Sequence, residues 1–234
     1  MPSGMLRAVV IIAHGFRGSK ENGGKIYGFA DRLNDIGLGA VAFDFSGSGE
    51  SEGDFKNVTI SRQAADLQHV IDFADHNYEV PLIVLGRSLG GSTVLAGAAA
   101  DERIAGYIFW SAPVLLHDTF SAVLGEAYRE LLSGRTVELE DEWGRFFLAP
   151  DLIQDFNHHD MLACIRHLGV RPVLVVHGQN DEVVSTENAF LIAEGAPNAS
   201  LHIIKGADHR FAGKVEQRQD ITLKWLLENI IERR

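Results

Sequence analysis

A serine, an aspartate and a histidine are the residues of this sequence best suited to nucleophilic catalysis. Ser88 lies at the centre of residues 86–90, GRSLG, and Asp181 and His209 each follow a later apolar run. A serine hydroxyl needs a base to take its proton and a third group to hold that base in the right tautomer. If each apolar run is a parallel strand, the three side chains meet at the carboxyl edge of one sheet.

The surroundings of Ser88 favour a sharp strand–turn–helix. Residues 81–85 form an apolar, strand-like run, and residues 91–100 are small and apolar enough for a buried helix. Gly86 and Gly90 leave room for neighbouring backbones to approach closely. The pattern therefore predicts a nucleophile elbow with Ser88 exposed at its apex, and the alternative is an ordinary turn between a strand and a helix.

Apolar, β-branched runs alternate with helical patterns along the chain. The first run, Ala8–Ala13, is apolar throughout, which is typical of a strand buried on both faces of a sheet. The alternation predicts an α/β fold with a mostly parallel sheet covered by helices on both sides. The expected strands are residues 8–13, 40–43, 81–85, 104–110, 172–176 and 201–204.

One long segment interrupts this alternation. Residues 113–169 contain no convincing strand, and so long a gap is interpreted as a helical cap inserted over the carboxyl edge of the sheet. A pair of ordinary crossover helices is the alternative. The core is then residues 1–112 and 170–234, and helical patches in the cap are residues 120–132, 140–148 and 161–168.

Five motifs lie at the ends of the expected strands: HGFRG at 14–18, DFSGSGES at 44–51, GRSLGG at 86–91, HGQNDEVV at 177–184 and GADHRF at 206–211. Together they resemble the α/β hydrolases of the serine aminopeptidase S33-like group, and within it the small bacterial cinnamoyl/feruloyl esterases. The resemblance runs from Ala8 to the end of the chain except in the cap. It implies an α/β-hydrolase fold.

The resemblance also implies a role for each residue of the expected triad. Ser88 is the nucleophile, His209 the general base and Asp181 the acid that orients the histidine, in the chain order of an α/β hydrolase. Two other acids remain open, because Asp208 adjoins the histidine and Glu182 adjoins Asp181. Asp208 is the weaker choice, since a neighbour in sequence usually points away from the ring.

A tetrahedral intermediate needs backbone N–H donors aimed at its oxygen. The two positions that suit this oxyanion hole are Leu89, which follows the nucleophile, and Phe16, at the end of the first strand. His14 is expected to brace that loop by hydrogen bonding and is left outside the catalytic set.

These expectations predict a serine hydrolase that cleaves carboxylic esters through an acyl-enzyme. Small or aromatic acyl groups are favoured because the cap is short. A thioesterase, an aminoacyl or peptide amidase, and a non-catalytic ligand receptor of the same fold are the alternatives. Because a general base must be neutral, activity is expected to fall below about pH 6 to 7.

The composition of the chain limits the classes of partner that it is expected to bind. With 21 Lys and Arg against 32 Asp and Glu, the net charge of −11 disfavours nucleic acid, and no basic run suggests a membrane surface. Cys164 is the only cysteine, and the adjacent His158 and His159 lack the helical spacing of a zinc site. We therefore expect a small-molecule ester substrate, no metal, no cofactor and, in the absence of an evident signal peptide, a cytoplasmic location.

Only Met1 to Arg7 precede the first expected strand. The antiparallel strand pair with which larger α/β hydrolases usually begin is therefore expected to be missing, which leaves about six strands, unless the numbered start lies downstream of the true one. The strand that contains Val41 then becomes a sheet edge, which exposes backbone donors and acceptors. The chain is expected to be a monomer or a homodimer.

Overall fold

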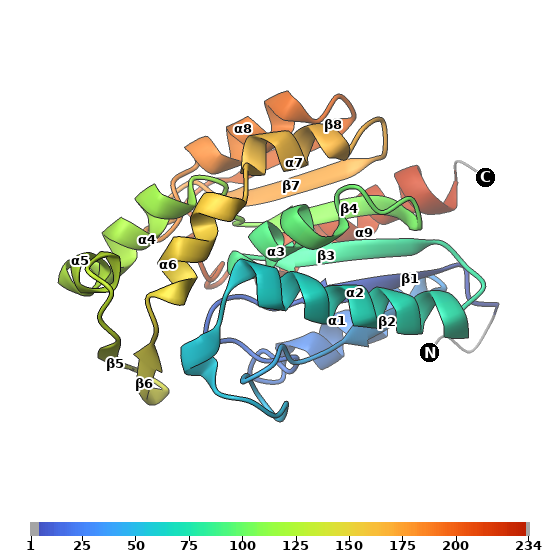
Figure 1. The fold of residues 1–234 in the computed structure, drawn as a ribbon. Coiled ribbons are helices and arrows are strands. Elements are labelled where there is room, and N and C mark those ends of the chain that lie inside the picture. The colour runs from blue at the N-terminus through green and yellow to red at the C-terminus, as the bar shows by residue number, and fades with distance from the viewer. Residues whose placement is uncertain (1–4, 233–234) are drawn as a thin grey trace.

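Six parallel strands form the central sheet of the protein, whose computed structural model describes residues 5–232. Their order across the sheet is β2-β1-β3-β4-β7-β8, and helices cover both faces (Figure 1). This arrangement confirms the predicted α/β-hydrolase fold class. The strands are β1 Ala8–Ala13, β2 Leu38–Ala42, β3 Leu82–Arg87, β4 Ile104–Trp110, β7 Val173–Gly178 and β8 Ala199–Ile204.

β1 lies between β2 and β3, and its side chains alternate between two hydrophobic cores. Val9 and Ile11 belong to the core on one face of the sheet, and Val10 and Ile12 to the core on the other. A strand with a core on each face has no polar side, which is why its sequence is apolar throughout. The same reason makes β1 easy to recognise from sequence.

Each core is closed by its own set of helices. α2, α3, α7 and α8 contribute buried side chains to the core that contains Ile11, whereas α1 and α9 contribute to the core that contains Val10. Figure 1 shows α2 and α3 on one side of the sheet and α1 and α9 on the other. The helices are α1 Lys25–Asp35, α2 Ile60–Asn77, α3 Leu89–Ala98, α7 Met161–His167, α8 Glu187–Gly195 and α9 Val215–Leu226, with a π-helical segment η3 Leu227–Ile231.

The segment between β4 and β7 is mixed rather than purely helical, and it extends beyond the carboxyl end of the sheet (Figure 1). The predicted helix over residues 140–148 is wrong, because strands β5 and β6 form an antiparallel hairpin there. In β6, Phe146 and Leu148 are buried while Arg145 and Phe147 are exposed, the period of two that belongs to a strand. The segment comprises α4 Leu116–Leu124, α5 Glu126–Leu132, β5 Val137–Asp141, β6 Gly144–Leu148, α6 Asp151–Asp155, the 3₁₀ turn η2 Phe156–His158 and α7.

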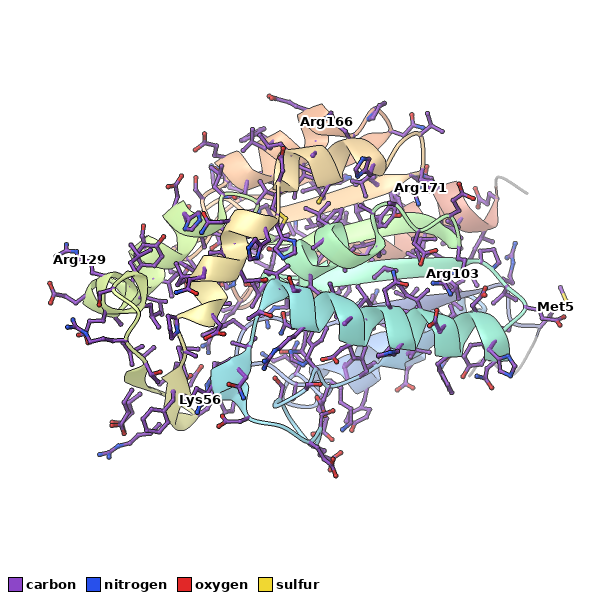
Figure 2. The ribbon with its side chains drawn as sticks, viewed as in Figure 1. Met5, Lys56, Arg103, Arg129, Arg166 and Arg171 are labelled. Carbon is purple, nitrogen blue, oxygen red and sulfur yellow. The ribbon has the colours of Figure 1, made fainter. Side chains whose placement is uncertain are left out.

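Two arginines hold the amino ends of β4 and β7 (Figure 2). Arg171 donates to the backbone carbonyls of Leu168 at 2.9 Å and Asp101 at 2.7 Å, and it stacks on the ring of Tyr107. Arg103 pairs with the Asp101 carboxylate at 2.7 Å. Both guanidinium groups are satisfied by protein acceptors at the edge of the sheet opposite the predicted site.

β2 and β8 are the two edges of the sheet, as expected for the strand that contains Val41. Within residues 5–232, every strand pairing of the central sheet is parallel. Part of the segment Met1 to Arg7, on which the missing strand pair was judged, lies outside the described residues. Whether the protein is a monomer or a homodimer stays a prediction, and sedimentation equilibrium tests it.

Candidate active site

Ser88 lies at a tight turn between β3 and α3. Its backbone has φ 51° and ψ −129°, a strained conformation for a residue with a side chain. A Cβ on Gly86 would lie 2.5 Å from the Cα of Gly91, and a Cβ on Gly90 would lie 2.4 Å from the carbonyl oxygen of Ala13. The two glycines therefore permit backbone packing that no other residue allows, and the packing holds the serine in its strained geometry.

The structure brings Ser88, His209 and Asp181 together at the carboxyl edge of the sheet. The Nε2 atom of His209 is 3.1 Å from Ser88 Oγ, and its Nδ1 atom is 2.9 Å from Asp181 Oδ2. Because a carboxylate only accepts hydrogen bonds, Nδ1–H donates to Asp181 and Nε2 is left to accept from the serine hydroxyl. This is the arrangement that a general base beside a nucleophile requires.

The two alternative acids have other partners. Asp208 Oδ1 accepts from the backbone N–H of Ala212 at 2.8 Å and closes a turn. Glu182 Oε2 accepts from the backbone N–H of His209 at 3.1 Å, so it binds the main chain of the loop. Among the hydrogen bonds of residues 5–232, neither acid contacts the imidazole ring.

His177, the first residue of the HGQNDEVV motif, is a neighbour of the predicted acid and was not among the predicted site residues. Its Nε2 atom lies 3.2 Å from Asp181 Oδ2 and 2.9 Å from the carbonyl oxygen of Val184, and its side chain is fully buried. Since both neighbours are acceptors, Nε2 carries the hydrogen. The only sequence signal for this contact is the spacing of four residues between His177 and Asp181.

The environment of Asp181 keeps its carboxylate ionised. Burial acts to raise its pKa, but hydrogen bonds from His177, His209 and the backbone N–H of Val184 outweigh burial and hold the pKa well below its usual range. Those N–H groups bind the charged form, which is why they favour it. A permanently charged carboxylate can orient His209 and stabilise the imidazolium form during a reaction.

The predicted oxyanion amides lie on the two loops that meet at the serine. Leu89 is the first residue of α3, and Phe16 follows β1. Among the hydrogen bonds of the described chain, neither N–H donates to another protein group. His14 braces the loop, because its Nε2 accepts from the Phe45 N–H at 3.2 Å and its Nδ1 donates to the Gly15 carbonyl at 2.9 Å. Because the N–H groups of Phe16 and Leu89 have no acceptor among the described residues, both are free to donate to a ligand.

A buried carboxylate ties the Phe16 loop to the Gly- and Ser-rich loop after β2. Asp44 accepts from the backbone N–H of Lys20 at 2.6 Å, from Lys20 Nζ at 2.9 Å and from the Glu50 N–H at 3.0 Å. Burial would raise the Asp44 pKa, yet the bonds from Lys20 and Glu50 lower it. Gly49, at φ 53°, leaves space for the carboxylate, since a Cβ there would lie 2.3 Å from Asp44 Cγ.

A cavity of about 640 Å³ opens at the serine. Phe16, Ser88 and His209 line it, together with Trp143 at the tip of the β5–β6 hairpin and Arg218 in the first turn of α9. Its volume is in the range of small-molecule sites. Gly49 also lines it, so the loop after β2 contributes to its wall.

The β5–β6 hairpin packs on the Phe16 loop. The ring of Phe16 lies edge-on to Phe55, Phe120 and Phe146, with centroids 5.1, 5.6 and 6.1 Å away. Arg17 donates to both Asp141 oxygens, at 3.0 and 3.2 Å, and its guanidinium lies 4.3 Å from the Phe146 ring centroid. The hairpin therefore forms one wall of the cavity and also contacts a predicted oxyanion donor.

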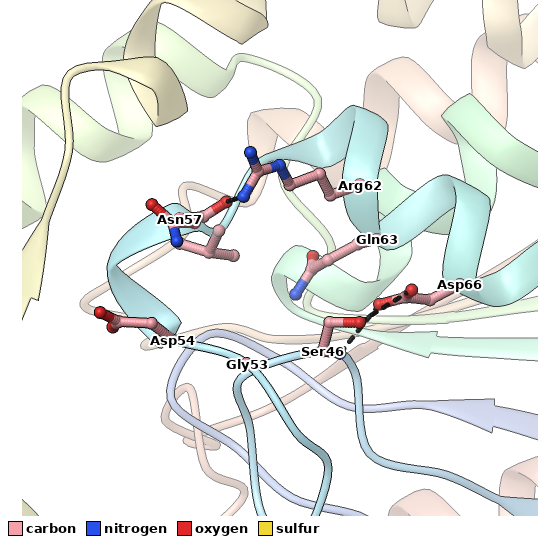
Figure 3. Close-up of a pocket in the computed structure, with 8 residues that line it drawn as sticks. Ser46, Gly53, Asp54, Asn57, Arg62, Gln63 and Asp66 are labelled. Atoms are coloured by element: carbon pink, nitrogen blue, oxygen red, sulfur yellow. Dashed lines mark hydrogen bonds between the residues drawn. The ribbon is translucent and has the colours of Figure 1, made fainter.

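A second pocket, of about 110 Å³, lies between the loop after β2 and the start of α2 (Figure 3). Asp66 accepts from the N–H and the hydroxyl of Ser46 at 2.8 and 3.0 Å, and Arg62 donates to the Asn57 carbonyl at 3.0 Å. These polar groups already satisfy one another. No residue of the predicted site lines this pocket.

Cys164, His158 and His159 are not among the residues that line the cavity. Cys164 is half-buried on α7, where burial raises the pKa of its thiol. His159 contacts Ser61 Oγ at 3.0 Å and Asp155 at 3.2 Å, which joins η2 and α6 to the start of α2. In residues 5–232, no group of three or more His, Cys, Asp or Glu side chains could hold a metal ion. None of the helices in that range is both long and apolar enough to cross a membrane.

Several known proteins are similar to this chain in sequence. The profile of the family described as "Serine aminopeptidase, S33" matches residues 4–145, more than half of the 234 residues. Palmitoyl-protein thioesterase ABHD10 of Mus musculus is 27% identical over 214 residues, which cover 85% of this chain and 68% of that protein. Monoacylglycerol lipase of Mycolicibacterium smegmatis is 26% identical over 255 residues, 96% of this chain and 89% of its own length.

Solved structures share the fold. Est1E from Butyrivibrio proteoclasticus with ferulic acid bound has a TM-score of 0.81 at 24% identity, covering 98% of this chain and 92% of that one. A putative hydrolase from Agrobacterium vitis has a TM-score of 0.77 at 25% identity, covering 98% and 90%.

Proposed function

This chain belongs to the serine aminopeptidase S33 family of α/β-hydrolase-fold serine hydrolases, and from that premise we propose that it cleaves carboxylic esters of small or aromatic acids through an acyl-enzyme. The observation that carries the proposal is the chain of contacts from Ser88 Oγ to His209 Nε2 at 3.1 Å and from His209 Nδ1 to Asp181 at 2.9 Å. Ser88 and His209 line a cavity whose volume is in the range of small-molecule sites.

The proposed reaction begins when His209 Nε2 takes the Ser88 proton as Oγ attacks the ester carbonyl. The N–H groups of Phe16 and Leu89 donate to the resulting oxyanion, and one such donor is typically worth about 3 kcal/mol in the transition state. The imidazolium then returns the proton to the leaving alcohol, which departs and leaves the acyl group on Ser88. Water, deprotonated by His209, releases the carboxylic acid in the same way.

A thioester is the second candidate substrate class. The palmitoyl-protein thioesterases that this chain resembles support it. The chain spans about two thirds of the length of those relatives, 68% of the mouse protein and 66% of the human one. The proposed attack and oxyanion steps are common to esters and thioesters, so only the leaving group distinguishes the two. Peptide and aminoacyl amides remain the less favoured choice within the same chemistry.

Activity-based labelling with a fluorophosphonate probe, together with hydrolysis of 4-nitrophenyl acetate, butyrate and octanoate, methyl ferulate and matched thioesters, tests the proposal. We expect the wild-type protein to be labelled and to turn over. Ser88→Ala should lose labelling and reduce kcat by on the order of 10⁴-fold or more.

Ser121→Ala is the matched control, because Ser121 is exposed on α4 and its hydroxyl donates, among the described residues, only to the Asp118 carbonyl. It should keep both labelling and turnover. A wild-type protein that binds esters without labelling or turnover would instead be a ligand receptor.

A further inference from the structure

Among residues 5–232, four arginine side chains line the cavity that contains Ser88 and His209, although the chain as a whole carries a net charge of −11. So many cations around one small volume repel one another unless anions neutralise them. The four are Arg17, Arg87, Arg210 and Arg218.

Two of the four are neutralised by acids of the β5–β6 hairpin. Arg17 makes its two hydrogen bonds to Asp141, and Arg210 donates to Glu142. Each pair cancels its own charge within the wall of the cavity. These two arginines therefore help to hold the hairpin in place, and they need no anion from a ligand.

Arg87 and Arg218 have no such partner. None of the ion pairs of residues 5–232 includes either of them. The Nε atom of each is buried without an acceptor among the described residues, and the best contact of Arg87 is a long one, 3.5 Å from its Nη1 to Asn22 Oδ1. Arg218 is only 3% exposed. A buried charge without a partner is costly, and proteins ordinarily pair such charges.

Two aromatic rings hold the Arg218 side chain in position but accept no hydrogen bond from its N–H groups. Its guanidinium lies 3.8 Å from the Trp110 ring centroid and 4.9 Å from that of Phe211. Contact through the face of the guanidinium leaves the N–H groups in its plane free to donate. Arg171, by contrast, stacks on Tyr107 and also donates to backbone carbonyls.

The surroundings lower the pKa values of both guanidinium groups. Burial and then the charge of Arg87 lower the pKa of Arg218 to about 9. Burial and then the charge of Arg210 lower the pKa of Arg87, and the charge of Asp181 offsets only part of this effect. A bound anion would relieve both effects, because opposite charge favours the protonated forms.

We propose that Arg87 and Arg218 form an anion subsite beside Ser88, so that the preferred ester carries a carboxylate or phosphate group in addition to the bond that is cleaved. This inference rests on the proposed function. Guanidinium groups present planar pairs of donors that match the oxygens of either anion. The residue before the nucleophile and the first turn of α9 thereby select the substrate by charge.

A matched pair of esters tests the subsite: the 4-nitrophenyl monoester of glutaric acid, which is anionic, and its methyl ester, which is neutral. We expect kcat/KM of the wild-type protein to favour the anionic ester by about tenfold or more, the range of a charged hydrogen bond. Arg87→Gln and Arg218→Gln should each bring the ratio toward one, mainly through a higher KM for the anionic ester. A wild-type ratio of one or less overturns the proposal.

Arg129→Gln is the charge-matched control, because Arg129 is exposed on α5 (Figure 2) and its only ion pair within the described part of the chain is with Glu126. The ratio should stay at the wild-type value in this variant, and an equal loss there would mean that overall charge, not the subsite, sets the preference. Arg218→Lys guards against misfolding, since it keeps the charge beside Trp110 and should retain part of the preference.

Binding without turnover separates the subsite from the hydrolase. Glutarate and inorganic phosphate, each added to Ser88→Ala, should raise its melting temperature, and the larger shift identifies the preferred anion. Adding Arg87→Gln should abolish the shift. A shift without wild-type turnover would refute the ester hydrolase and leave the subsite intact, whereas turnover without any shift or charge preference would refute the subsite alone.

Discussion

At the residue scale, the candidate site depends on how one carboxylate is held. Asp181 accepts from His209, from His177 and from the backbone N–H groups of Val183 and Val184, and its side chain is fully enclosed. Each donor fixes a different direction of approach, so the carboxylate has a single orientation. His209 inherits that orientation through its Nδ1–H, and the position of Nε2 relative to Ser88 follows.

Asp181→Asn should lower kcat by on the order of 10⁴-fold with little change in fold. An amide can donate to Nδ1, which favours the tautomer with hydrogen on Nε2 and removes the acceptor that Ser88 needs. Steady-state kinetics with 4-nitrophenyl butyrate, and circular dichroism to verify folding, measure the effect.

Asp208→Asn is the control for this prediction, because the Asp208 carboxylate caps a turn at Ala212. It should keep most of the activity. Full turnover by Asp181→Asn combined with loss in Asp208→Asn would reverse the assignment of the acid.

At the element scale, the β5–β6 hairpin is joined to the loop after β1 by Arg17 and Asp141. Both side chains are partly exposed, 20% and 30%, so the ion pair contributes about 1 kcal/mol or less to stability. Its effect on the site is larger than its energy suggests, because Arg17 adjoins Phe16, whose N–H is the proposed oxyanion donor. A loose hairpin would release that donor from its position.

Arg17→Met should reduce kcat on the order of tenfold, within the roughly 10²-fold that a displacement of about 1 Å can cost. Methionine keeps apolar contact with Phe146 and loses the two hydrogen bonds to Asp141. Thermal unfolding should shift little. Arg145→Gln is the comparison on the same hairpin, since Arg145 is exposed and pairs only loosely with Glu138 and Glu140, at 3.6 and 3.7 Å. Equal losses in both variants would contradict a specific role for the Arg17 pair.

The elements differ in how well the sequence reveals them. All six strands of the central sheet were predicted. The four inner strands are continuous apolar runs because each has a core on both faces. The edge strands β2 and β8 are less buried and were recognised from shorter apolar runs. The hairpin was missed because β5 and β6 each alternate over only five residues and expose charged side chains, which reads as a polar helix. Its burial pattern depends on contacts that form only on folding, such as those of Phe146 with Phe16 and Phe55, which lie far earlier in the chain.

The same distinction applies to the candidate site. Ser88, Asp181 and His209 could be chosen from sequence, since each follows a strand and the carboxyl ends of parallel strands share an edge. His177 and Arg218 could not. His177 matters because folding places it beside the Asp181 carboxylate. Arg218 matters because folding buries it without an acid beside it. Neither the composition of the chain nor the spacing of its residues predicts that a buried arginine will lack an acidic partner.

At the scale of the whole molecule, buried carboxylates set the response to acid. The folded-state pKa values of Asp181 and Asp44 are lowered, so the folded chain binds these protons more weakly than the unfolded chain does. Their contribution to stability is therefore complete above about pH 4, the ordinary range of an aspartate, and is lost as pH falls below it.

The free energy of unfolding, measured by urea titration between neutral and strongly acidic pH, should accordingly fall below about pH 4. In Asp181→Asn the slope of that fall should be shallower, because one titrating group is gone. Asp208→Asn serves as the control. An unchanged slope in Asp181→Asn would mean that its carboxylate is not held in the charged form.

The position of Trp143 gives the molecule a fluorescent probe of its own cavity. Of the three tryptophans, Trp110 and Trp225 are each 3% exposed, whereas Trp143 is 67% exposed at the hairpin tip and lines the cavity. The long-wavelength side of the tryptophan emission spectrum therefore comes mainly from Trp143. Protection of that emission from acrylamide would report an occupied cavity for any ligand, coloured or not, without a label or a turnover assay.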